Sequence, residues 1–106
     1  MIQNTENLVN IGSRTSLEVN EIVMLVAEIN YTSLYLTNGN RILVSYHLGK
    51  LHGRLVNYPI FIRPNRNTII NTNHLENIGL DSLRIQGIEI KMSRRRKEQI
   101  LNQLNL

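Results

Sequence analysis

Short apolar runs separated by polar turns dominate the pattern of this chain. Residues 23–27 read Val-Met-Leu-Val-Ala, which predicts a buried strand with residues 16–19 as its expected partner. Residues 60–63 and 68–71 predict two further strands on either side of a polar loop. Pro64 opens that loop, because proline has no N–H to donate to a sheet ladder and keeps the residue before it extended. The pattern is typical of a mainly β chain.

The dipeptide at 38–39, Asn-Gly, predicts a β-hairpin because it tolerates the positive φ angles of a type I′ turn. A two-residue loop there sets Tyr35 opposite Ile42 on one face of the hairpin. It sets Leu34 opposite Leu43 on the other face. Apolar pairs on both faces indicate an inner pair of strands that is covered on both sides.

A second hairpin is predicted around the dipeptide at 86–87, Gln-Gly, where apolar and charged residues alternate. A two-residue loop sets three pairs of residues opposite one another: Ile85 and Ile88, Arg84 and Glu89, and Leu83 and Ile90. The apolar pairs share one face and the charged pair occupies the other, so the pattern and the turn agree.

Two segments have helical periodicity. Leu48, Leu51 and Leu55 share one face of a short helix. Two glycines inside it each weaken it by about 1 kcal/mol, so it depends on packing against the sheet. The last helix runs from Ser93, its N-cap, to about residue 104. Its buried face is formed by three apolar residues: Ile100, Leu101 and Leu104.

The composition indicates one globular domain with a core of mainly Ile, Leu and Val, since the 106 residues include one Phe and no Trp. Residues 1–10 are polar and aperiodic, so we expect a flexible leader followed by a domain at 11–106. The lack of cysteine excludes disulfide frameworks, thiolate zinc sites and cysteine nucleophiles. No apolar run could span a membrane and no signal peptide is visible, so we expect a cytoplasmic protein.

The positive charge is unevenly distributed along the chain. The net charge is +4, and five of the seven residues at 91–97 are basic, whereas residues 1–30 carry four acids and only Arg14. The basic run at 94–97 fills the first turn of the last helix, where the macrodipole disfavours each cation by roughly 0.3–1 kcal/mol. A bound phosphate makes each of these interactions favourable. The alternative is a solvated basic turn whose aliphatic stems pack on the sheet.

Two polar loops are candidates for contacts with bases. Arginine pairs with guanine and asparagine with adenine in the major groove, so residues 65–67, Asn-Arg-Asn, could read bases or could simply form a turn. Arg63 either joins this site or caps a strand edge. Residues 30–32, Asn-Tyr-Thr, follow the buried strand, and Tyr31 could equally contact a ligand or plug the core.

The histidines do not suggest a metal site or an active site. His47 and His52 are five residues apart and diverge around a helix, and His74 lies in a single helical turn that Asn71 or Asn73 would cap. We expect surface or capping roles for all three. Glycine loops for phosphate, zinc-protease helices and nucleophile elbows are missing, so no enzyme and no cofactor are expected, although a triad built from distant residues stays open.

The chain from about residue 18 to 104 resembles the LytTR DNA-binding domain of bacterial response regulators, which belong to two-component systems. The resemblance is carried by four stretches in the family's order: residues 26–31, residues 43–51, residues 61–71 with the Asn-His-Leu at 73–75, and the Ser-Arg-Arg at 93–95. It implies small antiparallel sheets stacked as an elongated β sandwich with short helices. It also implies binding of double-stranded DNA through loops.

Three segments correspond to those with which the family reads bases, and they coincide with the sites nominated above. With their neighbours they give these candidate DNA-binding residues: Asn30, Tyr31, Thr32, Arg63, Asn65, Arg66, Asn67, Arg94, Arg95, Arg96 and Lys97. Many members have a histidine, a basic residue and a serine where this chain has Asn65, Arg66 and Asn67, so the base preference does not transfer. Most members also follow a receiver domain, and none fits here, which suggests a stand-alone regulator or part of a longer chain.

The leading hypothesis is a bacterial transcription regulator that binds double-stranded DNA, with two copies on repeated sites. Arg66 and Arg95 are the candidates for base readout, and Arg94, Arg96 and Lys97 for phosphate contacts. One alternative is a protein-interaction module whose basic end docks an acidic partner. Another is RNA binding, although the strands present few aromatic residues for stacking on bases.

Overall fold

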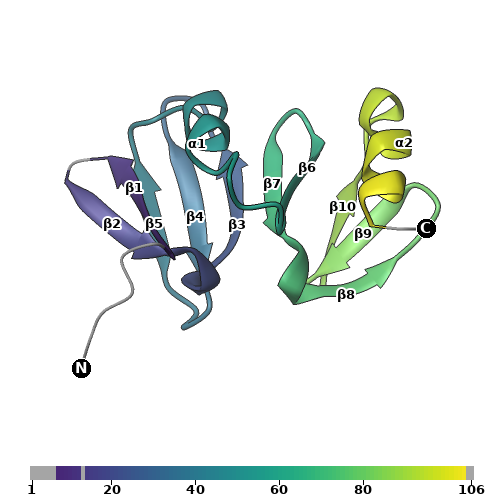
Figure 1. Cartoon of the computed structure of the whole chain (residues 1–106), viewed down its shortest axis with the longest axis horizontal. Coiled ribbons are helices and arrows are strands. Elements are labelled where there is room, and N and C mark those ends of the chain that lie inside the picture. The colour runs from purple at the N-terminus through teal and green to yellow at the C-terminus, as the bar shows by residue number, and fades with distance from the viewer. Residues whose placement is uncertain (1–6, 13, 105–106) are drawn as a thin grey trace.

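The computed structural model describes residues 7–12 and 14–104. In this part of the chain, short strands form three antiparallel sheets that two α-helices cover (Figure 1). The elements are β1 (Leu8–Gly12), β2 (Thr15–Glu18), η2 (Val19–Glu21), β3 (Ile22–Ala27), β4 (Thr32–Leu36), β5 (Arg41–Val44), α1 (Leu48–Arg54), β6 (Phe61–Asn65), β7 (Thr68–Asn71), η3 (Thr72–His74), β8 (Leu75–Ile78), β9 (Ser82–Ile85), β10 (Ile88–Lys91) and α2 (Arg94–Gln103), where η marks a 3₁₀ turn.

A five-stranded sheet in the order β5-β4-β3-β7-β6 forms the middle of the molecule. The two-stranded sheet β1-β2 lies on one side of it, and the three-stranded sheet β10-β9-β8 lies on the other, at the left and right of Figure 1. The dimensions of 41 × 34 × 24 Å fit this row of layers. The prediction of a mainly β fold of small stacked antiparallel sheets is confirmed.

The central sheet is apolar on both faces, so two separate hydrophobic clusters form. Successive strand residues point to opposite faces, and Ile69 enters the first cluster while Ile70 enters the second. Phe61 and Ile62 divide in the same way. This two-sided burial explains why these strands read as continuous apolar runs.

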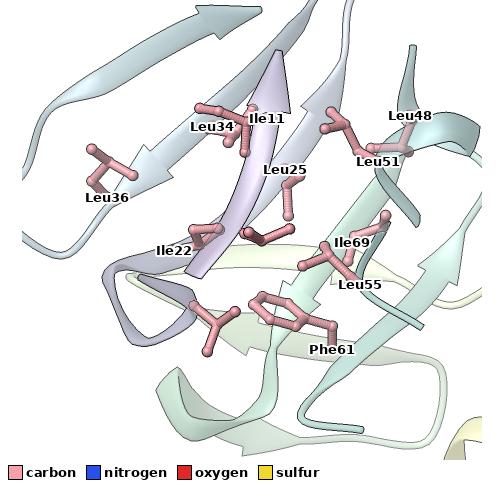
Figure 2. Close-up of a cluster of buried hydrophobic side chains, with 12 residues drawn as sticks. Ile11, Ile22, Leu25, Leu34, Leu36, Leu48, Leu51, Leu55, Phe61 and Ile69 are labelled. Carbon is pink, nitrogen blue, oxygen red and sulfur yellow. The ribbon is translucent and has the colours of Figure 1, made fainter. Parts of the chain in front are cut away.

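The first cluster joins β1, the central sheet and α1. Figure 2 shows Ile11 of β1 and Leu51 of α1 gathered in one cluster with Leu25 and Ile69 of the sheet. Leu55, just after the helix, packs into the same cluster and is buried. The expected leucine face of α1 is therefore confirmed, and the helix leans on the sheet as its two glycines require.

The second cluster joins the opposite face of the central sheet to β8–β10 and α2. Ile62 and Ile70 meet Leu83 and Ile85 of β9 there, and Ile100 of α2 closes the cluster. Leu101 and Leu104 pack against it as half-buried residues. The predicted apolar face of the last helix is confirmed.

The hairpin around residues 86–87 has the predicted register, with all three expected pairs opposite one another. Gln86 and Gly87 both have positive φ angles, 49° and 74°, as a type I′ turn requires. The local alternation and the turn dipeptide are together sufficient to fix this element.

The register predicted for the first hairpin is wrong by one residue, because Leu34 faces Ile42 and Tyr35 faces Arg41. The loop has three residues, with only Gly39 left-handed, and the side chain of Asn38 accepts the N–H of Asn40 at 2.9 Å. The shift turns Ile42 toward the first cluster. The edge strand β5 is consequently uncovered on its other side.

Two further predictions are wrong, one about the partner of β3 and one about the extent of the leader. The partners of β3 are β4 and β7, whereas residues 15–18 pair with β1. The prediction of a flexible leader at residues 1–10 is wrong for residues 8–10, which belong to β1 and include the buried Val9. Residues 1–6 lie outside the described part of the chain. Val9 and Ile11 alternate with more polar positions, a strand signal that burial on only one face makes weak. The strand β8 was also not predicted.

Local capping follows the sequence closely. Ser93 caps α2 by accepting the N–H of Arg96 at 3.3 Å. His47 caps α1 through its ring nitrogen, and Asn71 caps η3. Asn71 is also completely buried and donates its amide N–H to the carbonyl of Ile22, so it ties β7 to the start of β3.

We predict that Asn71→Ala lowers the free energy of unfolding by about 1–3 kcal/mol, because it leaves the buried carbonyl of Ile22 without its partner. Urea denaturation of the variant would measure this loss. Asn73→Ala is the matched control, since Asn73 is exposed and contributes only its backbone N–H to the cap. Equal stability of the two variants would contradict the role of Asn71.

Candidate nucleic-acid interface

Two of the three nominated segments meet at one end of the central sheet. Because β3 and β7 are antiparallel neighbours, the end of β3 lies beside the start of β7. The N–H of Ala27 donates to the carbonyl of Asn67 at 2.8 Å, which joins the β3–β4 loop to the β6–β7 turn. In Figure 1 both connections lie along the upper edge of the molecule.

The third segment, the start of α2, is fixed to the same end through β6. The N–H of Ser93 donates to the carbonyl of Pro64 at 2.8 Å. The amide group of Asn65 donates to the carbonyl of Lys91 at 2.7 Å. Since α2 also packs on β6, its basic first turn lies beside the β6–β7 turn (Figure 1). The structure therefore brings together three segments that are far apart in the sequence.

The β6–β7 turn consists of Arg66 and Asn67, whose side chains are both exposed. Asn65 precedes them and uses both ends of its side chain inside the protein. Its oxygen accepts the N–H of Asn67 at 2.9 Å while its nitrogen donates to Lys91. Asn65 therefore shapes the turn and fixes it to β10, whereas the side chains of Arg66 and Asn67 face solvent.

Arg63 lies beneath this turn and holds it from inside. Its Nη2 donates to the carbonyl of Arg66 at 2.8 Å, and its Nη1 lies 3.4 Å from Nδ1 of His52 on α1. Its Nε is buried without a partner. Burial, and then the charges of Arg96 and Arg66, lower the pKa of Arg63. These cations crowd one another, which favours a neutralising anion at this place.

The first turn of α2 presents its cations in two directions. Arg94 and Arg95 are exposed, while Arg96 and Lys97 are half-buried beside the buried Ile100. The charge of Arg96 acts on residues of α1 and β6, so this side chain lies on the side of the β6–β7 turn. Arg94 and Arg95 therefore point away from the core, at the same end of the molecule as the β6–β7 turn.

Lys97 is about 100° around α2 from Arg96 and forms an ion pair with Asp81 at 2.5 Å. This hydrogen bond and the charge of Lys97 lower the pKa of Asp81. It is the only ion pair that the structure shows among residues 7–12 and 14–104. The arginines of the interface thus have no carboxylate partner in that part of the chain.

The β3–β4 loop supplies exposed side chains at residues 29–31, and β4 then begins with a buried side chain at residue 32. Asn30 is exposed and Tyr31 is 39% exposed, so Tyr31 is not a core plug. Thr32 is completely buried, and its hydroxyl donates to the carbonyl of Tyr46 at 2.7 Å. It therefore fixes the loop to the segment before α1. A pocket of about 160 Å³ lies between this loop and the start of α1.

The structure adds two residues that the sequence did not nominate. Ile29 is 96% exposed at the tip of the β3–β4 loop, where the apolar run of β3 appeared to continue. His52 approaches Arg63 from α1. A signal for His52 existed, since it lies four residues after Leu48 and three before Leu55, at the rim of the leucine face.

The described residues hold no group of three or more His, Asp or Glu that could bind a metal ion. No helix in the same part of the structure is long and apolar enough to cross a membrane.

Comparisons with known proteins agree on one family. A family model described as the LytTr DNA-binding domain matches residues 12–105. Among solved structures, the chain is similar to the LytTr DNA-binding domain of a putative methyl-accepting/DNA response regulator from Bacillus cereus, with a TM-score of 0.77 and 19% identity over 94% of this chain and 98% of that one. No curated protein matches the chain.

We predict that Asn65→Ala loosens the β6–β7 turn, because it removes the acceptor for the N–H of Asn67. Hydrogen exchange at this N–H should accelerate about fivefold, as expected for one lost hydrogen bond. Asn65→Asp keeps an oxygen that accepts this N–H but loses the nitrogen that donates to Lys91, so it should accelerate exchange less than Asn65→Ala does. An unchanged exchange rate in Asn65→Ala would show that the side chain does not hold the turn.

Proposed function

The chain belongs to the LytTR family of DNA-binding domains, and from this we propose that it binds double-stranded DNA sequence-specifically as a bacterial transcription regulator in the cytoplasm. The observation that carries the proposal is the convergence of three exposed polar segments at one end of the molecule. Hydrogen bonds from Ala27, Ser93 and Asn65 hold these segments to one another. A rigid set of loops can enter a groove without a large ordering cost.

The exposed side chains of this surface suit the major groove. Arg66 and Arg95 are our candidates for base readout, because an arginine can donate two hydrogen bonds to guanine. Asn67 and Asn30 add exposed amides that match adenine. Ile29 supplies an apolar side chain for the methyl group of thymine.

The remaining nominated residues support these contacts in two ways. Arg94, Arg96 and Lys97 surround the start of α2, where a phosphate would also meet free backbone N–H groups and the positive end of the helix dipole. Thr32 and Asn65 are withdrawn from base reading because their side chains are hydrogen-bonded inside the protein, and Arg63 because both of its Nη atoms contact protein groups. Their role in the proposal is to hold the reading loops in place.

Other partners fit the surface less well. An acidic protein could contact the arginines, but it would leave the exposed amides without the base edges that they match. Single-stranded RNA is bound mainly by stacking on aromatic residues, and Tyr31 is the only large aromatic side chain exposed among residues 7–12 and 14–104. Binding as two copies on repeated sites would add affinity without new contacts.

The test is a selection from random duplex DNA at two salt concentrations. We predict recovery of a defined motif, and Arg66→Ala and Arg95→Ala should each lose roughly 1–3 kcal/mol of discrimination at one position of it. Arg41→Ala removes the same charge at the far end of the central sheet and should leave the motif unchanged. Binding that only follows salt, with no motif, would contradict the proposal and favour the acidic-partner alternative.

The ion pair between Lys97 and Asp81 gives a second prediction. Lys97→Ala should weaken binding to all duplexes alike and reduce the salt slope by about one. Asp81→Asn should act in the opposite direction, with tighter binding at low salt that disappears at high salt, since it frees the lysine for a phosphate. Affinity titrations over a salt series would measure both. A loss confined to the preferred site in Lys97→Ala would contradict a phosphate contact.

A further inference from the structure

We propose that His52 is a positioning residue for base readout: as a neutral acceptor it aims Arg63 at the β6–β7 turn, and its protonation releases that turn. This inference rests on the proposed function and extends it to a residue on α1 that touches no DNA itself. It makes the selectivity of the domain depend on pH, whereas its general affinity for DNA does not fall.

The geometry links three elements in one chain of contacts. Nδ1 of His52 on α1 lies 3.4 Å from Nη1 of Arg63 on β6. Nη2 of the same guanidinium donates at 2.8 Å to the carbonyl of Arg66 in the turn. The guanidinium is a rigid plane, so the acceptor at one nitrogen constrains the direction of the other. The next residue after this carbonyl is Asn67, a proposed reader.

The donor and acceptor roles in the contact with Arg63 determine the protonation state of His52. Arginine is always protonated in proteins and has no acceptor, so Nδ1 must be the acceptor in this contact. The ring is then neutral, with its proton on Nε2. A second proton at Nδ1 would place two donors face to face and break the contact.

The surroundings of His52 favour the same state. Partial burial, and then the charges of Arg63 and Arg96, lower the pKa of His52 from the ordinary histidine value of 6.5. The charged groups that act on this ring from β6 and α2 are thus both cationic. A lowered pKa means that this contact is present at neutral pH and is lost as the pH falls below the lowered value.

Protonation has two effects that separate selectivity from affinity. Loss of the acceptor frees Arg63 and with it the turn, which weakens contacts that need a fixed geometry. The new charge joins the basic surface and strengthens attraction to any phosphate backbone. The ratio of specific to non-specific affinity should therefore fall on acidification, while non-specific binding holds or rises.

The experiment compares duplexes that carry the selected motif with scrambled duplexes, at about pH 7.5 and at the lowest pH at which the domain stays folded. For the unmodified domain we expect the affinity ratio to fall about tenfold between them, as for one lost hydrogen bond to a charged group. His52→Asn keeps an oxygen acceptor near the position of Nδ1 but cannot be protonated, so it should keep the full ratio at both pH values. His52→Leu should show the low ratio at both. His74→Asn, at the opposite end of β7, is the matched control and should titrate like the unmodified domain.

An NMR titration of the domain without DNA, which records the backbone amides of Arg66 and Asn67 against pH, tests the role of His52 separately from the proposed DNA binding. In the unmodified domain, the chemical shifts of these amides should change with pH as His52 is protonated. In His52→Asn the same chemical shifts should not change with pH. If no duplex is bound specifically but the shifts titrate, the proposed function fails while the contact stands. A full ratio in a folded His52→Leu, or an unchanged pH dependence in His52→Asn, would overturn the role of His52.

Discussion

The structure depends on one constraint: the central five-stranded sheet is apolar on both faces and must be covered on both. The sheet β1-β2 and α1 cover one face, while β8–β10 and α2 cover the other. Because α2 must place Ile100 in the second cluster, its basic start comes to lie beside the end of β6. The hydrophobic core thus determines where the charges of the interface are presented.

At that end of the molecule, some polar residues hold the β6–β7 turn through internal hydrogen bonds, while others of the same type are exposed to solvent. Asn65 and Asn67 are two residues apart and chemically identical, yet the first has both ends of its amide bonded and the second is exposed. Arg63 and Arg66 differ in the same way. The proposed readout by Arg66 and Asn67 therefore relies on Arg63 and Asn65, residues of the same two types whose side chains bond within the protein and hold the turn.

The sequence predicted best what is decided locally. The hairpin at 86–87 and the caps formed by Ser93 and Asn71 depend on neighbouring residues, and all three are confirmed. The partners of β3 include the distant β7, and there the prediction was wrong. Two local predictions also failed: the register of the hairpin around residues 38–39 is off by one residue, and residues 8–10 of β1, which pairs with the adjacent β2, were assigned to a leader. For the candidate site, the sequence indicated the three segments but not which side chains are bonded internally, since burial and long-range acceptors such as the carbonyl of Lys91 decide this.

In the proposed function, the end of the molecule formed by the β3–β4 loop, the β6–β7 turn and the start of α2 is the DNA-binding surface. The most direct measurement is an NMR titration of the labelled domain with a duplex recovered by selection, which maps every backbone amide that changes. We expect the largest changes on residues 28–31, 65–67 and 93–97, with little change at the 86–87 turn or in β1-β2. The largest changes on β1-β2, or on the 86–87 turn, would contradict this proposal.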